Sequence, residues 1–588
     1  MNIKYSDQIS LWLKETGYTH FFYVGGGNVM HLVESLSRYL HGIPVIHEVA
    51  AGIAAEYFNA TSKKNKALAL VTAGPGLTNI VTAAAGAYLE SRELLILGGQ
   101  AKVEDMSNSG LRQRGIQEID GVSIMKPITK KSILMDKVWT KEYFSGVIHN
   151  VSDDRPGPVF IEIPIDIQAR KVSVDSSEIN FSDKRLKINN KELAKIQKLL
   201  SKSKRPLILI GGGVTRETAH KLADTLKSFG VPVATTWNGI DRIDSKHTCY
   251  VGRPNTWGQR SANIIIQQTD LLIVFGSRLG FQQTGFNWKS FCPVGKVIQI
   301  DLDEQELNKG HPMIELGLAV EANNALEKFL SLKPPECSEW SNFCKDIRKK
   351  IPLFEEGINK EFHGYVSPHK LIKIISNIAN SDDVIVPCSS GGANTLMMQM
   401  FEQKKGQYVL NDKGLASMGY GLSGAIGASI ANPNKRVILV EGDGGFAQNI
   451  QELGTLAINK CNIKIFIFDD GGYSSIRMTQ RSYFDGRYVG CDTQTGLGLP
   501  NWDKLFSSWG LRSLAITPKE LEKMEFLDTI NDKEPIAYIV KIAPEQTYFP
   551  KITSRIKKDG SMESNPLHKM TPELDRETNA IVLRYLDE

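Results

Sequence analysis

The feature that most constrains the fold is the acidic glycine turn within residues 440–446 and the second acidic turn that follows it at 469–472. An apolar run precedes each turn, at 436–440 and at 463–468, and predicts a buried strand. Helical spacing over 446–459 lies between them. This strand–turn–helix–strand unit puts both acidic turns at the carboxyl ends of strands, where open parallel sheets bind ligands.

The first turn combines groups that attract an anion with one that repels it. Its glycines let backbone N–H groups approach a phosphate, and the helix that follows adds a favourable dipole: Gly442, Gly444 and Gly445. Asp443 alone would repel that phosphate, so a divalent cation between them resolves the conflict. Asp443, Asp470 and the carbonyl of Gly472 could supply three oxygens to Mg²⁺, leaving the rest to a diphosphate and water. The alternative is a solvated Gly-Asp-Gly turn.

The two turns together resemble the signature of thiamin-diphosphate enzymes, a Gly-Asp-Gly followed at this distance by an Asn-Asn pair. This chain has Asp469-Asp470 where Asn-Asn is usual. Aspartate at the second position is still a hard oxygen ligand, so the resemblance implies bound Mg²⁺ and thiamin diphosphate. It also places Tyr473 and Ser474 at the cofactor.

Composition excludes several other classes. At 588 residues the chain is too long for one core, so two to four domains are expected. The net charge is only +5, from 70 basic and 65 acidic residues, which does not indicate nucleic-acid binding. No apolar stretch approaches the ~20 residues of a membrane span, and the first residues lack a signal-peptide pattern. Seven scattered cysteines suggest reduced thiols in the cytoplasm.

Residues 1–170 alternate strands and helices, which predicts a doubly wound sheet. Gly25 and Gly26 follow a strand over 21–24 and form either a tight structural turn or a phosphate loop. Glu48 lies between a strand and a helix of small residues over 49–61. Desolvation there would favour the protonated acid. The alternative is that Glu48 simply occupies a first helical turn, where the dipole favours acidic residues.

Further motifs in this domain resemble the pyrimidine-binding domain of acetolactate (acetohydroxyacid) synthases. They are His47-Glu48, the turn at 74–79, Gly-Gln at 99–100, Gln-Glu at 117–118 and Arg-Pro-Gly-Pro at 155–158. The resemblance implies that Glu48 contacts N1′ of the aminopyrimidine. It also implies cofactor contacts at several loop residues: Gly25, Gly26, Thr72, Pro75, Asn79 and Gln117.

A polar linker at 170–190 separates this domain from a second α/β domain at 190–330. There, apolar strands run into short turns at 211–213, 235–236, 276–278 and 301. The turns resemble the family's middle domain, which holds FAD in acetolactate synthases. Many relatives keep this domain with no flavin, so both readings stay open.

Residues 365–550 read as the third domain, which carries the acidic turns. By resemblance, Ser390, Gly391 and Asn394 lie near the diphosphate and the carbonyl of Ala416 faces the aminopyrimidine. Met418 is either plain core or the apolar residue that bends the cofactor. Residues 551–588 form either a segment that covers the active site or a disordered tail.

These observations predict an α/β protein with three doubly wound parallel-sheet domains, which bind the pyrimidine, form the middle and bind the diphosphate. We expect thiamin-diphosphate-dependent decarboxylation of a 2-keto acid, pyruvate, and transfer of the remaining unit to a carbonyl acceptor. In acetolactate synthases an arginine and a tryptophan help select a second keto acid; Gln282 and Thr479 stand at those positions.

We therefore expect a keto-sugar or an aldehyde as acceptor, as in the acetolactate-synthase-like enzymes of surface-carbohydrate pathways. The alternatives are a true acetolactate synthase, a pyruvate-oxidase-like flavoenzyme and a catalytically silent subunit. The family assembles its site across a dimer interface, so we expect a homodimer or homotetramer.

Overall fold

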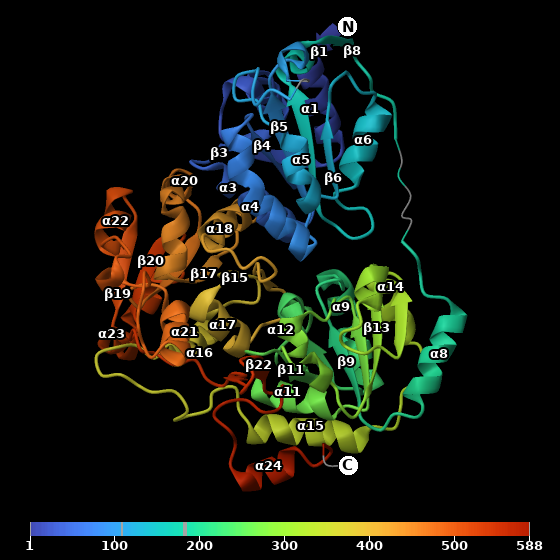
Figure 1. The fold of residues 1–588 in the computed structure, drawn as a ribbon, viewed down its shortest axis with the longest axis vertical. Helices are drawn as coiled ribbons and strands as arrows, with labels where there is room; N and C mark the ends of the chain where they lie inside the picture. Colours follow the sequence, from blue (N-terminus) through green and yellow to red (C-terminus); the bar gives the residue numbers. More distant parts are fainter. Residues whose placement is uncertain (1, 108–109, 180, 182–184, 587–588) are drawn as a thin grey trace. The chain divides into compact units, whose positions relative to one another are not determined.

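The computed structural model describes residues 2–107, 110–179, 181 and 185–586. It contains three six-stranded sheets, formed by the first, middle and last parts of the chain (Figure 1). The α/β prediction with three parallel sheets is confirmed. Two compact units divide the chain: residues 1–184, 383–394 and 410–544 form unit 1, and residues 185–382, 395–409 and 545–588 form unit 2.

The first sheet, in unit 1, has its strands in the order β3-β2-β4-β5-β7-β6. All neighbouring pairs are parallel. The strands are β2 (Tyr18–Tyr23), β3 (His41–Pro44), β4 (Lys66–Val71), β5 (Leu94–Gln100), β6 (Lys131–Leu134) and β7 (Pro158–Pro164). The helices include α1 (Tyr5–Glu15), α2 (Met30–Tyr39), α3 (Glu48–Thr61), α4 (Pro75–Glu90), α6 (Lys141–His149) and α7 (Ile165–Ala169).

The third sheet repeats this strand order as β16-β15-β17-β18-β20-β19. Its strands are β15 (Val384–Pro387), β16 (Tyr408–Val409), β17 (Val437–Gly442), β18 (Ile463–Asp469), β19 (Arg512–Ile516) and β20 (Ile536–Lys541). Its helices include α17 (Gly391–Met400), α18 (Tyr420–Ala431), α21 (Ser474–Tyr483) and α22 (Trp502–Ser508). In both sheets the order reverses beside the first strand, so β2/β4 and β15/β17 form the switch points at which such sheets bind ligands.

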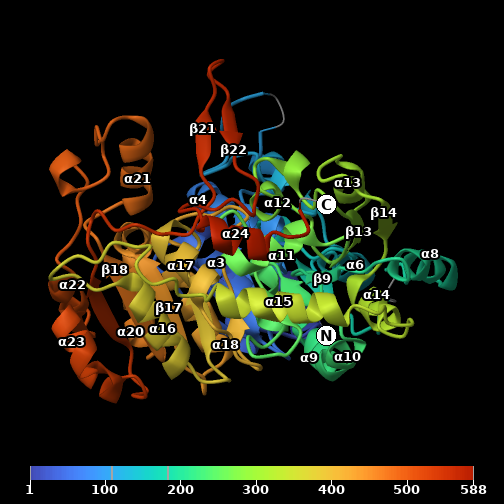
Figure 2. The same ribbon diagram turned by 90° about the horizontal axis from the view of Figure 1, so that it is seen from below.

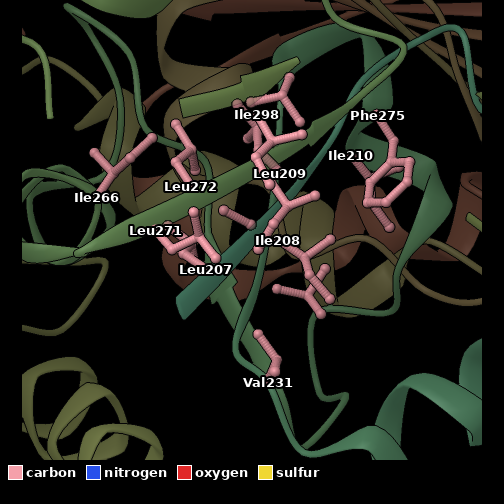
Figure 3. Close-up of a cluster of buried hydrophobic side chains, with 14 of the residues drawn as sticks. Leu207, Ile208, Leu209, Ile210, Val231, Ile266, Leu271, Leu272, Phe275 and Ile298 are labelled. Atoms are coloured by element: carbon pink, nitrogen blue, oxygen red, sulfur yellow. The ribbon is translucent and has the colours of Figure 1, made fainter. Parts of the chain in front are cut away.

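The middle sheet, in unit 2, has the order β11-β10-β9-β12-β13-β14. Its strands are β9 (Pro206–Ile210), β10 (Val233–Thr235), β11 (Tyr250–Gly252), β12 (Leu271–Phe275), β13 (Lys296–Asp301) and β14 (Leu316–Ala319). Figure 3 shows Leu207 to Ile210 of β9 packed with Leu271, Leu272 and Phe275 of β12. These strands are buried on both faces, which explains their continuous apolar sequence.

Residues 551–586 are folded on unit 2 rather than disordered. The hairpin β21 (Ser554–Ile556) and β22 (Met562–Ser564) stands out from this unit, and α24 (Arg576–Val582) lies beside α11 (Arg260–Gln268) (Figure 2). Arg260 Nη1 donates to the carbonyl of Pro572 at 2.7 Å, and Gln268 Nε2 donates to that of Val582 at 2.8 Å. That this segment covers the active site stays a prediction.

The helix expected over 446–459 is wrong as a single element. The segment is divided into α19 (Asp443–Phe446), a 3₁₀ stretch η6 (Ala447–Glu452) and α20 (Leu453–Ile458). Asn449 leaves helical geometry (φ −135°, ψ 32°) because its Nδ2 donates to the carbonyl of Gly419 at 2.7 Å. A tertiary hydrogen bond thus overrides the local helical pattern. None of the helices in the described residues combines the length and apolar character that crossing a membrane requires.

Helices α3 and α18 pack almost backbone to backbone within unit 1. A Cβ added at Gly427 would lie 2.1 Å from the carbonyl oxygen of Ala54, and one at Gly424 would lie 2.7 Å from the ring of Tyr57. Small residues on both helices permit this approach, as the sequence of α3 predicted. The packing holds the middle of α3, the helix that begins at Glu48.

We predict that Gly427→Ala lowers the free energy of unfolding by about 1–3 kcal/mol, because the added methyl group overpacks this contact. Gly146→Ala is the matched control: Gly146 is also helical, in α6, but a Cβ there meets nothing within 4 Å. That variant should be neutral or slightly stabilised. Urea denaturation followed by circular dichroism compares the two, and equal stability of both variants would contradict the packing argument.

Candidate functional site

Glu48 begins α3 and is 8% exposed as a residue. Asn79 Nδ2, on α4, donates to Glu48 Oε2 at 2.9 Å. A Cβ at Gly76 would lie 3.5 Å from Glu48 Oε1 and 3.1 Å from Thr72 Cγ2, so the start of α4 lies directly against both side chains. The start of α3 thus carries a nearly buried acid, Glu48, which accepts a hydrogen bond from the side chain of Asn79.

The other predicted residues of this domain gather around the same switch point. A Cβ at Gly26 would be 2.5 Å from Thr72, so the turns after β2 and β4 touch. Gln117 has a positive φ of 59°, and its carbonyl oxygen lies 2.5 Å from where a Cβ at Gly74 would be. Gly25 and Pro75 are exposed beside them. The tight contact at Gly26 explains this glycine structurally, and Gly25 stays open to a ligand.

The acidic turns lie at the carboxyl ends of β17 and β18, as predicted. Asp443 is 1% exposed. Its Oδ2 accepts hydrogen bonds from the N–H groups of Gly471 and Gly472 at 2.8 and 3.0 Å, and its Oδ1 accepts from Gly444 at 2.6 Å. These bonds tie the two turns together, so one carboxylate organises both.

Two buried carboxylates meet here. Burial raises the pKa of Asp443 well above its ordinary value, and the neighbouring Asp470 and Asp469 raise it further. Burial also raises the pKa of Asp470 to about 6, although Arg477 opposes the shift. Like charges held close in a desolvated site need a compensating cation. The donor set therefore fits Mg²⁺, held by Asp443, Asp470 and the Gly472 carbonyl.

Within the described residues no cluster of three histidine, cysteine or acidic side chains is arranged for a metal. Two carboxylates and a carbonyl leave the coordination shell of an octahedral ion incomplete. That incompleteness is typical of Mg²⁺ sites that use substrate or cofactor phosphates as ligands. The glycines fit this role: a Cβ at Gly444 would strike the ring of Tyr473 at 2.4 Å, and Gly472 has φ 143°.

The remaining predicted residues surround the second switch point. Helix α17 begins at Gly391 (φ 77°), just after Ser390, and the Nδ2 of Asn394 donates to the carbonyl of Cys388. The Oδ1 of Asn394 is buried without a partner, as is Thr72 Oγ1 at the first switch point. Orphaned buried polar atoms at both places are expected where a polar ligand completes the hydrogen bonding. Ser474 begins α21 and bonds the Asp470 side chain.

Ala416 has a left-handed backbone (φ 57°), which is unfavourable for a residue with a Cβ. Such conformations concentrate at functional sites, where surrounding contacts impose them. Met418 is half-buried, and its sulfur accepts from Gln448 Nε2 at 3.8 Å. Residues 416–418, which we call the strap, are therefore constrained in conformation and accessible, as contact with a ligand requires.

A buried ion-pair cluster holds that strap in unit 1. Arg92 Nη1 donates to Glu56 Oε1 at 2.7 Å, and Arg92 Nη2 donates to the carbonyl of Asn411 at 2.5 Å. The carboxylate of Glu90 accepts from the N–H of Gly414, two residues before Ala416. A second buried acid, Glu452, accepts from the N–H groups of Ile46 and His47 at 3.2 and 3.0 Å.

Sequence reasoning missed these supporting residues, as well as Arg477. Glu452 and His47 are 405 positions apart, and Arg92 and Asn411 are 319 apart. No local pattern joins such pairs. Arg477 differs, because it lies only seven positions after its partner Asp470 and could have been named from the sequence.

The glycine turn of the middle domain is bonded to the neighbouring turn. The N–H groups of Gly211 and Gly213 donate to the carbonyls of Phe275 and Gly276, each at 2.9 Å. A Cβ at Gly211 would lie 2.2 Å from Gly276 O, so the turns after β9 and β12 close the switch point between them. These two glycines serve close packing of the turns, and FAD binding by the middle domain stays a prediction.

Three family models match the chain. They are the thiamine pyrophosphate enzyme N-terminal binding domain over residues 3–124, the central domain over 193–329 and the C-terminal binding domain over 390–537. The chain belongs to the thiamine pyrophosphate enzymes. The N-terminal model includes Glu48 and the C-terminal model includes Asp443.

Relatives extend along nearly the whole chain of this thiamine pyrophosphate enzyme. A probable acetolactate synthase large subunit of Methanococcus aeolicus is 29% identical over 525 residues, covering 85% of each chain. The acetolactate synthase isozyme 1 large subunit of Escherichia coli (strain K12) is 26% identical and covers 92% of this chain and 94% of its own. A large subunit from Cyanidium caldarium is 29% identical over 526 residues. The enzyme is therefore acetolactate synthase-like.

The buried cluster beneath Ala416 predicts a pH dependence of stability. Burial raises the pKa of Asp412 to about 8, and Glu90 and Glu56 add to the shift against the opposing charge of Arg92. The folded chain therefore holds this proton after the unfolded chain, with an ordinary value of 3.8, has lost it. This contribution to stability falls as pH rises from about 4 to about 8.

We accordingly expect Asp412→Asn to unfold at a higher temperature than the wild type at pH 9, with the difference shrinking toward pH 4. The asparagine imitates the neutral acid. Thermal unfolding across this pH range tests it. A difference in unfolding temperature that does not change with pH would contradict the assignment to Asp412.

Proposed function

We propose that the enzyme decarboxylates a 2-keto acid, pyruvate, and transfers the remaining two-carbon unit to a carbonyl acceptor. One observation carries the proposal: a nearly buried glutamate at one switch point accompanies two buried carboxylates at the other. These are the groups that the two ends of thiamine diphosphate require. The bound cofactor would supply addition to the keto carbon and would hold the electrons left as CO₂ departs.

The chain's own residues would bind and orient this cofactor. Glu48 would share a proton with N1′ of the aminopyrimidine, held in place by the bond from Asn79. Asp443, Asp470 and the carbonyl of Gly472 would hold Mg²⁺ against the diphosphate. Met418 would support the cofactor from the strap. Positioning of this kind contributes much of an enzyme's rate enhancement.

The acceptor is the more specific part of the proposal. Gln282 and Thr479 replace the arginine and tryptophan that select a second keto acid in acetolactate synthases. Losing a carboxylate-binding arginine removes a charge-assisted bond of roughly 1.5–3 kcal/mol. Thr479 lies on the exposed side of α21, and its hydroxyl turns back to the carbonyl of Ser475 at 3.0 Å. We therefore favour a keto-sugar or aldehyde acceptor of a surface-carbohydrate pathway.

Acetolactate synthase activity is the second candidate, and the names of the relatives favour it. A pyruvate-oxidase-like reaction would need FAD, and we place it third because two N–H groups of the middle domain's glycine turn are bonded within the domain. We further propose a homodimer or homotetramer. The seven cysteines are free thiols, which supports our placement in the reducing cytoplasm.

Glu48→Gln tests the catalytic role. We expect the variant to fold normally and to lose about 10²–10⁴-fold in turnover, because the amide can no longer exchange the proton. Release of CO₂ from pyruvate is the measurement, and an unchanged thermal unfolding curve is the control for folding. Near-normal CO₂ release by the variant would rule out this role for Glu48.

The acceptor is tested by supplying pyruvate alone or with aldehydes and keto-sugars, and by recording the visible spectrum of the purified protein. We expect slow acetolactate formation, faster consumption of pyruvate with an added acceptor, and no flavin absorption. Rapid acetolactate formation from pyruvate alone would establish the second candidate. A bound yellow cofactor with a requirement for an electron acceptor would establish the flavoenzyme.

A further inference from the structure

Arg477 forms a buried ion pair inside the acidic turn. The side chains of Arg477 and Asp470 are 2% and 4% exposed. Arg477 Nη2 donates to Asp470 Oδ1 at 2.5 Å and to the Asp470 carbonyl at 2.9 Å, and Nη1 donates to the carbonyl of Cys491 at 3.4 Å. One guanidinium group therefore grips both the side chain and the backbone of a proposed metal ligand.

The pair changes the charge of the turn. Where the family has asparagine at position 470, this chain has aspartate, and the extra negative charge would lie buried beside Asp443. Arg477 supplies the opposite charge in direct contact. A turn with an aspartate and an arginine thus has the same net charge as a turn with a neutral amide.

Asp470 keeps room for a cation while it is held. An ionised carboxylate has about four acceptor positions. Arg477 occupies one of them on Oδ1, and the side chain of Ser474 donates a further bond. The remaining positions are free to coordinate an ion, and the bonds fix the orientation of the carboxylate.

We propose that Arg477 is a positioning residue for the metal, and that Asp470 and Arg477 work as an obligatory pair in place of the usual amide. The inference rests on the proposed Mg²⁺ and thiamine diphosphate site. It makes an unusual demand: changing Asp470 to the family's own asparagine should damage this enzyme, because Arg477 is then left as an unpaired buried cation beside a dication.

Mn²⁺ is the probe, since electron paramagnetic resonance reports free Mn²⁺ without any turnover. The full-length protein, freed of metal and saturated with thiamine diphosphate, is titrated with Mn²⁺. We expect Asp470→Asn and Arg477→Met each to weaken Mn²⁺ binding by about 10–100-fold. The double variant should recover most of the affinity lost in Asp470→Asn, because it restores the charge balance with an amide ligand.

A matched control exists in the same sheet. Arg436 Nη2 and Asp383 Oδ2 form another buried pair at 2.5 Å, at the start of β15 and β17 rather than at the carboxyl ends. Asp383→Asn should lower the unfolding temperature as a broken buried pair does, yet leave Mn²⁺ affinity within a few-fold of the wild type. If Arg477→Met does not fold, Arg477→Lys replaces it. Lysine keeps the charge but cannot donate from two nitrogens as the guanidinium group does, so this variant should also weaken Mn²⁺ binding.

The outcomes separate the two proposals. Wild-type protein that binds neither Mn²⁺ nor thiamine diphosphate would overturn the cofactor site itself. Wild-type protein that binds both, with Asp470→Asn binding Mn²⁺ equally well, would overturn only the pairing. A double variant that binds Mn²⁺ no more tightly than Asp470→Asn would show that Arg477 stabilises the fold and does not act on the metal.

Discussion

The two acidic turns of unit 1 are joined by a buried carboxylate, and burying a lone carboxylate is unfavourable. Asp443 receives three backbone hydrogen bonds that join the turns after β17 and β18. It also faces a second buried acid, Asp470. Arg477 pairs with Asp470, whereas hydrogen bonds satisfy the oxygens of Asp443 without removing its charge, so Asp443 still calls for a positive partner. The dication and diphosphate that we propose would meet that demand.

The repeated strand order explains why two such places exist. The first and third sheets share one topology, and each has a switch point of the kind at which open parallel sheets bind ligands. One switch point carries a nearly buried acid, Glu48, and the other carries the acidic turns. The middle sheet has a different order and a switch point closed by glycine contacts. The three sheets therefore differ in the residues that their switch-point turns present.

Much of the fold could be predicted because parallel strands buried on both faces leave continuous apolar runs. The runs ending at Val440 and Phe468 and the small-residue helix after Glu48 are such cases. The segment 446–459 could not be predicted, since a tertiary bond from Asn449 decides its shape. The main candidate residues were named from motifs, whereas Glu452 and Arg92 act through partners 405 and 319 positions away that only the folded chain brings near. Arg477 lies only seven positions from Asp470, and its burial, not its distance, hid its role.

The central claim is that these two switch points hold opposite ends of thiamine diphosphate. A crystal structure of the protein grown with thiamine diphosphate and magnesium tests it most directly. We predict density for the diphosphate and one metal ion against Asp443 and Asp470, with the aminopyrimidine against Glu48. Density for the cofactor elsewhere, or turns that stay empty at saturating cofactor, would contradict the account.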